Sequence, residues 1–265
     1  PFKVVATTEV DRFLRADRRR GLDLDRAPVM RVTLLDLGDG AHHLVWTYHH
    51  LLLDGWSTTT VLEDLRRAYG GRQLIARPAF STYVRWCRDQ PFDRDHWTAE
   101  LGDVEAATPL PFAARSTGPA PHAVHAWDLD EQRSSAVIEL ARRLRVTASS
   151  VLECAWALVL ARHADVDEVV FGVTVAGRSP DLDGIGDIVG LVMNTLPVRV
   201  RIEPDHTATA WIRTHFERSI GRQGREHDSL AEVQRCTRVR PPAPLCSTLF
   251  AYESYPGSDR RGAQI

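Results

Sequence analysis

Hydrophobic and polar positions predict a run of helices and strands in the first half of the chain. In the first segment, Val10, Phe13 and Leu14 share one helical face, and the helix is expected to stop at Gly21. Similar spacing predicts helices over residues 7–21, 56–69, 78–90 and 92–101. Residues 29–37 and 42–50 are strand-like, and Asp39-Gly40 between them predicts a hairpin turn.

The second half of the chain repeats this mixture. Strands are expected over residues 123–130, 167–177, 190–202 and 247–254, and helices over residues 131–145, 147–164 and 208–223. The helix after Thr147, a plausible N-cap, is apolar on nearly every face and should be buried. The pattern therefore predicts a mixed α/β protein.

A change of composition divides this pattern into two lobes. Residues 108–121 are rich in proline and poor in charge, which is typical of an extended linker. We therefore expect one lobe in residues 1–107, the linker in 108–121 and a second lobe in 122–265.

Bulk composition narrows the function classes. The 265 residues carry a formal net charge of −2, and 43% are hydrophobic, which is ordinary for a globular protein and gives no basic excess for nucleic acid. The cysteines form no C-x-x-C pair, so we expect neither a metal site nor a redox motif, and reduced thiols favour a cytoplasmic protein. No apolar run is long enough to predict a membrane span.

The stretch HHLLLDGWS, residues 49–57, carries the candidate chemistry. If residues 42–50 form one strand, His49 and His50 point to opposite faces, so only one of them can serve a given cavity. Asp54 and Gly55 then turn the chain into the helix that starts at Trp56, which Ser57 is expected to cap.

A histidine beside a helix N-terminus suits acyl transfer. An imidazole can accept a proton from an attacking amine or hydroxyl near neutral pH, and free backbone N–H groups can stabilise an oxyanion. A buried core histidine is a weaker alternative, because two histidines precede an Asp-Gly pair at this spacing. A metal ligand is weaker still, since adjacent strand residues diverge and no third ligand lies nearby in sequence. Thr59 breaks a G-x-S-x-G nucleophile elbow, and the spacing of residues 184–190 is wrong for a dinucleotide loop.

The stretch HHLLLDGWS resembles the H-H-x-x-x-D-G signature of nonribosomal peptide synthetase condensation domains, which belong with chloramphenicol acetyltransferase and related acyltransferases. Other segments match that family in order: RGLDLDRAPVMRVTLL, FSTYVRW, VVFGVTVAGR, VGLVMNTLPVRV, SLAEVQ and LFAYESYP. The family's first two motifs are absent, one of which supplies an arginine for the signature aspartate. The resemblance implies two acetyltransferase-like lobes with the active site in the tunnel between them, and a chain truncated at both ends.

The resemblance also implies roles for single residues. His50 is the active-site histidine, as a base or as a hydrogen-bonding positioner, and His49 supports it. Asp54 holds the motif loop, and Gly55 lets the backbone approach the substrate. Substrate-contacting positions by this comparison are Trp56, Ser57, Asn194 and Thr195. Arg178 lies on a loop expected to reach between the lobes, and His227 fits a late family motif too loosely to receive a role.

The implied reaction is amide formation between aminoacyl or peptidyl thioesters on phosphopantetheine arms. Donor and acceptor carrier proteins supply those arms, so the domain itself needs no cofactor. The other expected partner is an adjacent adenylation domain, and the chain is expected to be a monomeric domain of a multidomain protein. The absence of a serine or cysteine elbow agrees with direct attack by the acceptor amine.

Three other interpretations remain open at this stage. An epimerization domain has a Ser-Trp pair after the signature, whereas Thr58 follows Ser57 here, and heterocyclizing relatives replace the histidines by aspartates. A free-standing acyltransferase of the same fold, forming amides or esters, is harder to distinguish. A catalytically silent docking domain is the third interpretation, and the intact signature disfavours it.

Overall fold

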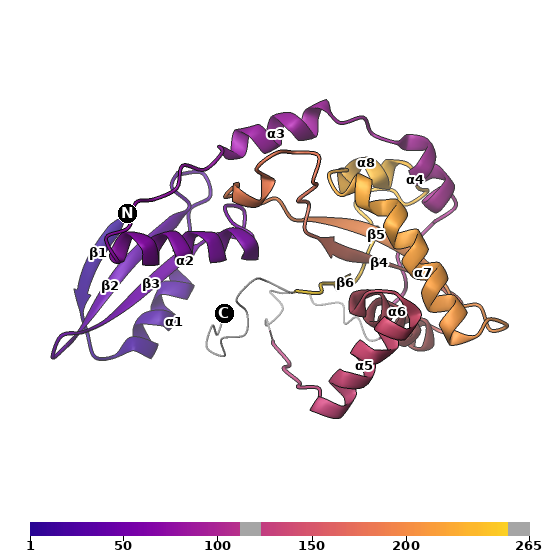
Figure 1. The fold of residues 1–265 in the computed structure, drawn as a ribbon, viewed down its shortest axis with the longest axis horizontal. Coiled ribbons are helices and arrows are strands. Elements are labelled where there is room, and N and C mark those ends of the chain that lie inside the picture. Colours follow the sequence, from indigo (N-terminus) through magenta and orange to yellow (C-terminus); the bar gives the residue numbers. More distant parts are fainter. Residues whose placement is uncertain (112–122, 254–265) are drawn as a thin grey trace. The chain divides into compact units, whose positions relative to one another are not determined.

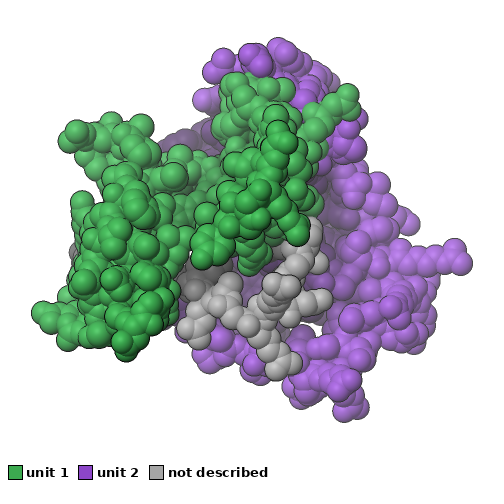
Figure 2. Space-filling model, turned by 60° about the vertical axis from the view of Figure 1, so that its left-hand side comes forward, with its two compact units in different colours: residues 1–84, 183–192, 255–265 green, residues 85–182, 193–254 purple. Residues whose placement is uncertain are grey.

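The computed structural model describes residues 1–111 and 123–253, which form two compact units (Figures 1 and 2). Among these residues, unit 1 combines residues 1–84 with 183–192, and unit 2 combines residues 85–182 with 193–253. Residues 183–192 thus belong to unit 1 although the chain on both sides of them belongs to unit 2. We call residues 183–192 the returning segment.

Unit 1 is built on a three-stranded sheet in the order β1-β2-β3. Its elements are β1 (Phe2–Ala6), α1 (Val10–Arg20), β2 (Met30–Gly38), β3 (Ala41–Tyr48), α2 (Gly55–Tyr69), the start of α3 (Phe80–Asp89) and the short helix η1 (Ile185–Asp187). Strand β1 runs parallel to β2, and β2 runs antiparallel to β3. The predicted hairpin turn is confirmed, because Asp39 and Gly40 have φ of 53° and 75°.

A buried ion pair fixes α1 to one face of this sheet. The Arg31 guanidinium donates to both carboxylate oxygens of Asp17, at 2.7 and 2.8 Å, and Thr47 on β3 donates to the same carboxylate at 2.6 Å. Hydrogen bonding from Arg31 is the main reason why the pKa of Asp17 lies below its usual value. Since neighbouring strand residues face opposite sides, Tyr48 lies on the other face, where its hydroxyl contacts Thr58 of α2 at 2.8 Å.

Unit 2 holds a second sheet in the order β5-β4-β6, with helices on both faces. Its elements are the end of α3, α4 (Arg94–Leu101), α5 (Glu131–Leu144), α6 (Ala148–Ala164), β4 (Glu168–Val175), β5 (Asn194–Arg201), α7 (Ala208–Arg222), η2 (Gln223–Arg225), α8 (Leu230–Arg235) and β6 (Leu249–Phe250). On one face, Phe171 of β4 packs with α5, α6 and α7. On the other, Val170 packs with Trp97 of α4 and Val233 of α8.

Several sequence predictions of these elements are confirmed and others are wrong. Thr147 caps α6, since its side chain accepts a hydrogen bond from the Ser150 amide at 3.1 Å. Residues 123–130, predicted as a strand, form none, and the last predicted strand is reduced to β6. These short runs alternate like strands, but periodicity does not say whether a partner strand is available.

The predicted lobes differ from the compact units at two places. Residues 85–107 lie in unit 2, because Trp97 and Leu101 of α4 are buried in its core, and the returning segment lies in unit 1. Within the predicted linker 108–121, residues 112–121 lie outside the described residues. Thr108 exchanges two hydrogen bonds with Val170, at 3.0 and 2.7 Å. The lobe boundaries stay a prediction.

No single helix in the described parts of the chain is long and apolar enough to cross a membrane. Helices α5 and α6 pass that test of length and composition only when they are taken together, and they meet at an angle of 108°.

Candidate functional site

The two signature histidines lie just beyond the end of β3. The sequence pattern had placed His49 and His50 in the strand, and this is wrong. The strand stops at Tyr48, so both histidines belong to the turn of residues 49–53. The expectation that only one of them can serve a given cavity is also wrong, because both line the same one. Strand alternation fails here because the ladder with β2 ends at Tyr48, which pairs with Met30.

His49 supports the turn from inside. Its backbone amide donates to the carbonyl of Val29 at 3.1 Å. Val29 is the residue before the first residue of β2. Its ring folds back, and Nδ1 accepts a hydrogen bond from the Leu51 amide at 3.1 Å. That acceptor role requires Nδ1 to carry no proton. The Leu52 amide closes the turn by donating to the His49 carbonyl at 3.0 Å.

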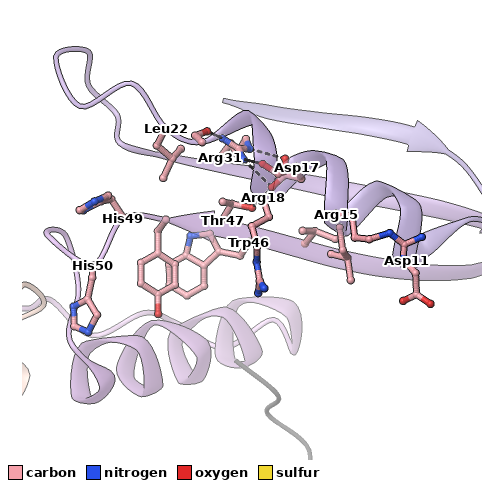
Figure 3. A pocket seen from close by; sticks show the side chains of 14 residues that line it. Asp11, Arg15, Asp17, Arg18, Leu22, Arg31, Trp46, Thr47, His49 and His50 are labelled. Carbon is pink, nitrogen blue, oxygen red and sulfur yellow. Dashed lines mark hydrogen bonds and ion pairs between the residues drawn. The ribbon is translucent and has the colours of Figure 1, made fainter. Parts of the chain in front are cut away.

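His50 is exposed and borders a large cavity of unit 1. The cavity measures about 740 Å³ and runs along β3 from Val45 to His50, with α1 as its other wall (Figure 3). Figure 3 shows the His49 and His50 rings pointing in different directions from adjacent backbone positions. The described residues offer no hydrogen-bond partner to the His50 ring, so its nitrogens are accessible to a substrate.

Asp54 organises the turn that follows the histidines. It is the N-cap of α2, and its Oδ1 accepts a hydrogen bond from the Ser57 amide at 2.7 Å. Its Oδ2 accepts a second one from the Val192 amide, at 3.1 Å. The predicted cap was Ser57, and this is corrected to Asp54, whose carboxylate satisfies an otherwise unpaired N–H group of the helix. The predicted loop-holding role of Asp54 agrees with these contacts.

Gly55 is the first residue of α2. No acceptor for its amide is present among residues 1–111 and 123–253, in keeping with the unpaired N–H groups of a helix N-terminus. The partial positive charge of the 15-residue helix α2 is concentrated at the same place. Gly55 therefore supplies a donor of the kind that stabilises an oxyanion.

Trp56 and Ser57 both contact the returning segment. The Trp56 indole donates to the carbonyl of Gly186 at 2.9 Å. Ser57 is completely buried; its hydroxyl donates to the carbonyl of Gly190 at 2.8 Å and accepts from the Gly190 amide at 3.0 Å. Such burial does not fit the predicted substrate contact of Ser57.

A further hydrogen bond ties the end of β3 to α2. The Thr58 hydroxyl donates to the carbonyl of Asp54 at 2.9 Å, so its contact with Tyr48 has the tyrosine hydroxyl as donor. The turn that carries His50 is thus held at both ends, by Tyr48 before it and by Asp54 after it.

Asn194 and Thr195 begin β5 in unit 2. The Asn194 amide donates to the carbonyls of Glu226 and Asp228 at 2.9 and 2.7 Å, and its Oδ1 accepts from the Thr195 amide at 2.8 Å. This is the strand-end hydrogen bonding that a structural asparagine makes. The substrate contacts predicted for Asn194 and Thr195 remain predictions.

His227 and its neighbours form a partly buried cluster in unit 2. The imidazole packs edge-on against Trp86, with ring centres 5.2 Å apart, and its Nε2 lies 3.6 Å from the Asp228 carboxylate. Trp97 donates to that carboxylate at 2.6 Å, yet burial keeps the pKa of Asp228 above its usual value. Arg178, which the sequence placed on a loop, follows β4 and is half-buried.

Sequence reasoning missed the returning segment. Residues 184–190 were considered as a dinucleotide loop and set aside, but no role next to the histidine signature was expected. The segment lies more than 120 residues further along the chain than the turn it contacts, and local patterns carry no such pairing. The one available signal was a pair of glycines, Gly186 and Gly190, where backbone groups approach other side chains closely.

Comparison with known proteins identifies the family of this chain. A family model described as "Condensation domain" matches residues 3–264. The chain is 37% identical over 260 residues to a linear gramicidin synthase of Brevibacillus parabrevis, covering 92% of the chain and 3% of that protein. It is 36% identical over 252 residues to chondramide synthase cmdD of Chondromyces crocatus, covering 91% of the chain and 6% of that protein. The chain therefore spans a small fraction of these relatives.

Solved structures show the same fold. A four-domain nonribosomal peptide synthetase bound to AMP and glycine matches with a TM-score of 0.78 at 17% identity, covering 97% of the chain and 21% of that protein. The X-domain from teicoplanin biosynthesis matches with a TM-score of 0.77 at 23% identity, covering 94% of the chain and 60% of that protein. With the family match over nearly all its residues, this chain belongs to the condensation domain family and is a condensation domain of the kind found in nonribosomal peptide synthetases.

Proposed function

We propose that this domain joins a donor and an acceptor, both held as thioesters on carrier proteins, through an amide bond. The observation that carries the proposal is the exposed His50 ring, which lies on a turn held at both ends beside the N-terminus of α2. The acceptor amine attacks the donor thioester carbonyl, the C–N bond forms, and the C–S bond breaks to release the donor thiol. No acyl-enzyme is involved.

Two groups of unit 1 have assigned roles in this reaction. A nitrogen of His50 accepts a hydrogen bond from the attacking amine, whose proton must leave as the C–N bond forms. The Gly55 amide, at the positive end of α2, donates to the developing oxyanion. Much of the acceleration comes from holding the two thioesters next to each other, because such alignment replaces a bimolecular encounter.

The substrates and partners belong to the proposal as well. The relatives are parts of synthases in which this chain corresponds to a few per cent of the length, so we infer neighbouring carrier and adenylation domains. Phosphopantetheine arms on the carriers are written here as substrates, and the domain needs no cofactor of its own. We also place the reaction in the cytoplasm, where carrier-bound thioesters are made.

The test uses the full-length protein that contains this sequence. It is mixed with one donor-loaded and one acceptor-loaded carrier protein, and the dipeptidyl carrier is measured by intact-protein mass spectrometry. We expect His50→Ala to lower the initial rate by about two orders of magnitude or more, in the range of general acid–base contributions. The matched control is His43→Ala, an exposed histidine on β3, which should keep the wild-type rate.

The outcomes separate the competing functions. Product that disappears in His50→Ala and persists in His43→Ala supports condensation with His50 in the site. Product that is equally abundant in both variants removes His50 from the mechanism. Absence of product from every loaded pair, with acyl transfer to a free amine or alcohol instead, would establish a free-standing acyltransferase. Absence of all turnover, with retained carrier binding, would establish a docking domain.

A further inference from the structure

The returning segment is joined to the first turn of α2 by hydrogen bonds in both directions. Ser57 donates to the Gly190 carbonyl and accepts from the Gly190 amide, at 2.8 and 3.0 Å. The Val192 amide donates to Asp54 at 3.1 Å. All of these groups are buried in unit 1, where hydrogen bonds are directional and costly to leave unmade.

The returning segment is itself held firmly. Ile188 and Val192 are almost completely buried, with exposed fractions of 0% and 1%. The Tyr83 hydroxyl of α3 donates to the Val192 carbonyl at 3.1 Å. A Cβ atom at Gly190 would overlap the ring of Phe80, so this position has room only for glycine. The segment therefore has one closely packed position against α3.

A second anchor lies in the middle of the segment, at Asp187. Arg77 donates to both carboxylate oxygens of Asp64 on α2, at 2.7 and 2.9 Å, and to Asp187 of η1 at 2.8 Å. The Arg77 and Asp64 side chains are 15% and 22% exposed, so this ion pair is partly shielded from solvent, whereas the Asp187 side chain is 61% exposed. Helix α2, which begins next to the His50 turn, is therefore connected to the segment both at its first turn and, through Arg77, at Asp64.

These contacts reach His50 through a short path. Asp54, which accepts from Val192, is also the residue that ends the 49–53 turn and caps α2. A shift of Gly190 or Val192 would move the Asp54 carboxylate, the N-terminus of α2 and the turn together. The geometry of His50 and the Gly55 amide thus depends on backbone groups encoded more than 120 residues later.

We propose that Ser57 and Gly190 are positioning residues for the condensation reaction, and that the returning segment sets the orientation of the His50 turn. Ser57 acts through this contact and does not touch the substrate. This inference rests on the proposed function, since positioning has meaning only if His50 and Gly55 act on a thioester. It goes beyond that function, because it states that residues 183–192, in the second half of the chain, determine the orientation of the turn that carries His50.

The first test compares two buried hydroxyls of the same helix in the full-length protein. Ser57→Ala removes both hydrogen bonds to Gly190, whereas Thr60→Ala removes a hydroxyl that bonds only within α2, to the Trp56 carbonyl at 3.0 Å. We expect Ser57→Ala to lower kcat at least about tenfold with KM for both carriers unchanged, since small misplacements of reacting groups are costly. Thr60→Ala should retain the wild-type kcat.

The second test measures the turn without using catalysis. Amide hydrogen exchange of Leu51 and Leu52, whose N–H groups bond to His49, reports the order of the turn. In the Ser57→Ala variant, these two amides and those of Gly190 and Val192 should exchange faster than in the wild type, while the exchange rates of peptides from β4 and β5 remain unchanged. Thr60→Ala should exchange at the wild-type rate in all of them.

A pair of substitutions tests whether the close packing of Gly190 against Phe80 of α3 is needed for catalysis. Gly190→Ala introduces the Cβ that overlaps Phe80, and it should reduce kcat as Ser57→Ala does. Adding Phe80→Ala opens that space, and the double variant should regain most of the lost kcat. Failure of this rescue, with both variants folded, would contradict a role for the fit between the segment and α3.

Three results would overturn the inference. They are a wild-type kcat in Ser57→Ala, a loss of kcat that merely follows the unfolded fraction, and unchanged exchange at Leu51 and Leu52. If the wild-type protein makes no amide at all, the proposed function fails, but the exchange measurements still decide whether the returning segment orders the His50 turn. The two failures are therefore distinguishable.

Discussion

At the scale of single residues, the Asp54 carboxylate connects the first turn of α2 to the returning segment. Each of its carboxylate oxygens accepts from a different backbone amide, Ser57 on one side and Val192 on the other. A carboxylate has no donor and can accept on both oxygens, which is why asparagine is not equivalent here. The aspartate therefore serves both backbone amides through its two carboxylate oxygens.

We therefore expect Asp54→Asn to destabilise unit 1. The amide group keeps the volume but presents N–H₂ to one of the two backbone donors, leaving it unpaired at a cost of about 1–3 kcal/mol. Urea unfolding followed by tryptophan fluorescence measures the change. The control is Asp39→Asn, an exposed hairpin residue with φ of 53°, a conformation that asparagine tolerates well. Equal stability of both variants would contradict the assigned role of Asp54.

At the scale of elements, helix α1 depends on one buried ion pair. Asp17 accepts from Arg31 and Thr47, and Arg31 also donates to the carbonyl of Gly21 at 2.6 Å, beyond the helix end. Replacing Arg31 by alanine leaves the Asp17 carboxylate buried without its main partner. Such losses typically cost about 3–5 kcal/mol.

The same ion pair predicts how stability changes in acid. The pKa of Asp17 is lowered in the folded state, chiefly by the Arg31 hydrogen bond, so the stabilisation is present above the unfolded-state pKa and is lost as pH falls through the folded-state pKa. We expect Asp17→Asn to be less stable than wild type at pH 7 and to approach it in acid. Unfolding titrations from pH 7 down to about pH 2, which extend well below the ordinary aspartate pKa, measure this. A constant difference over that range would contradict the linkage.

Elements were predictable from the sequence where a local signal defined them. The 39–40 hairpin was correct because its two positive-φ residues can be recognised locally, and α6 because Thr147 supplies the predicted cap. The end of β3 was missed by two residues, since only pairing with Met30 decides where the ladder stops. Leu65 and Tyr69 lie on the apolar stripe of α2, yet they are 45% and 95% exposed. The spacing of apolar residues predicts an apolar face on a helix, but it does not predict which other elements pack against that face.

The candidate site shows the same limit more clearly. His50, Asp54 and Gly55 were identified from their spacing and from the family resemblance, and the structure places His50 on the turn that leads into the Asp54 cap and the first residue of α2. The burial of Ser57 and the arrival of Gly190 were not predictable, because both result from a contact between distant parts of the chain. A single sequence without aligned relatives contains no record of such a pair.

At the scale of the whole molecule, each unit carries a buried or half-buried carboxyl group, and the pKa values of these two groups are shifted in opposite directions. Asp17 in unit 1 has an ion-pair partner and a lowered pKa, whereas Glu226 in unit 2 has a raised one, mainly because of burial. The Gly177 amide donates to Glu226 at 2.9 Å and opposes that shift without cancelling it. Glu226 also lines a cavity of about 220 Å³ with Arg222 and Glu153.

The sign of the Glu226 effect follows from its raised pKa. Stability associated with the neutral carboxyl is fully present below the unfolded-state pKa and is lost as pH rises through the folded-state pKa. Glu226→Gln keeps an oxygen that can accept from Gly177 and removes the ionisation. We expect this variant to be more stable than wild type at pH 7 and equal to it near pH 4.

Urea unfolding at the two pH values, with amide exchange assigned separately to peptides of β2 and of β4, distinguishes the units. The Glu226→Gln gain should be confined to unit 2, whereas Asp17→Asn should affect unit 1 with the opposite dependence on pH. If Glu226→Gln changed stability equally at both pH values, the effect would be one of packing. Because acid weakens one unit and relieves a buried charge in the other, a single pH optimum for the whole chain is a compromise between them.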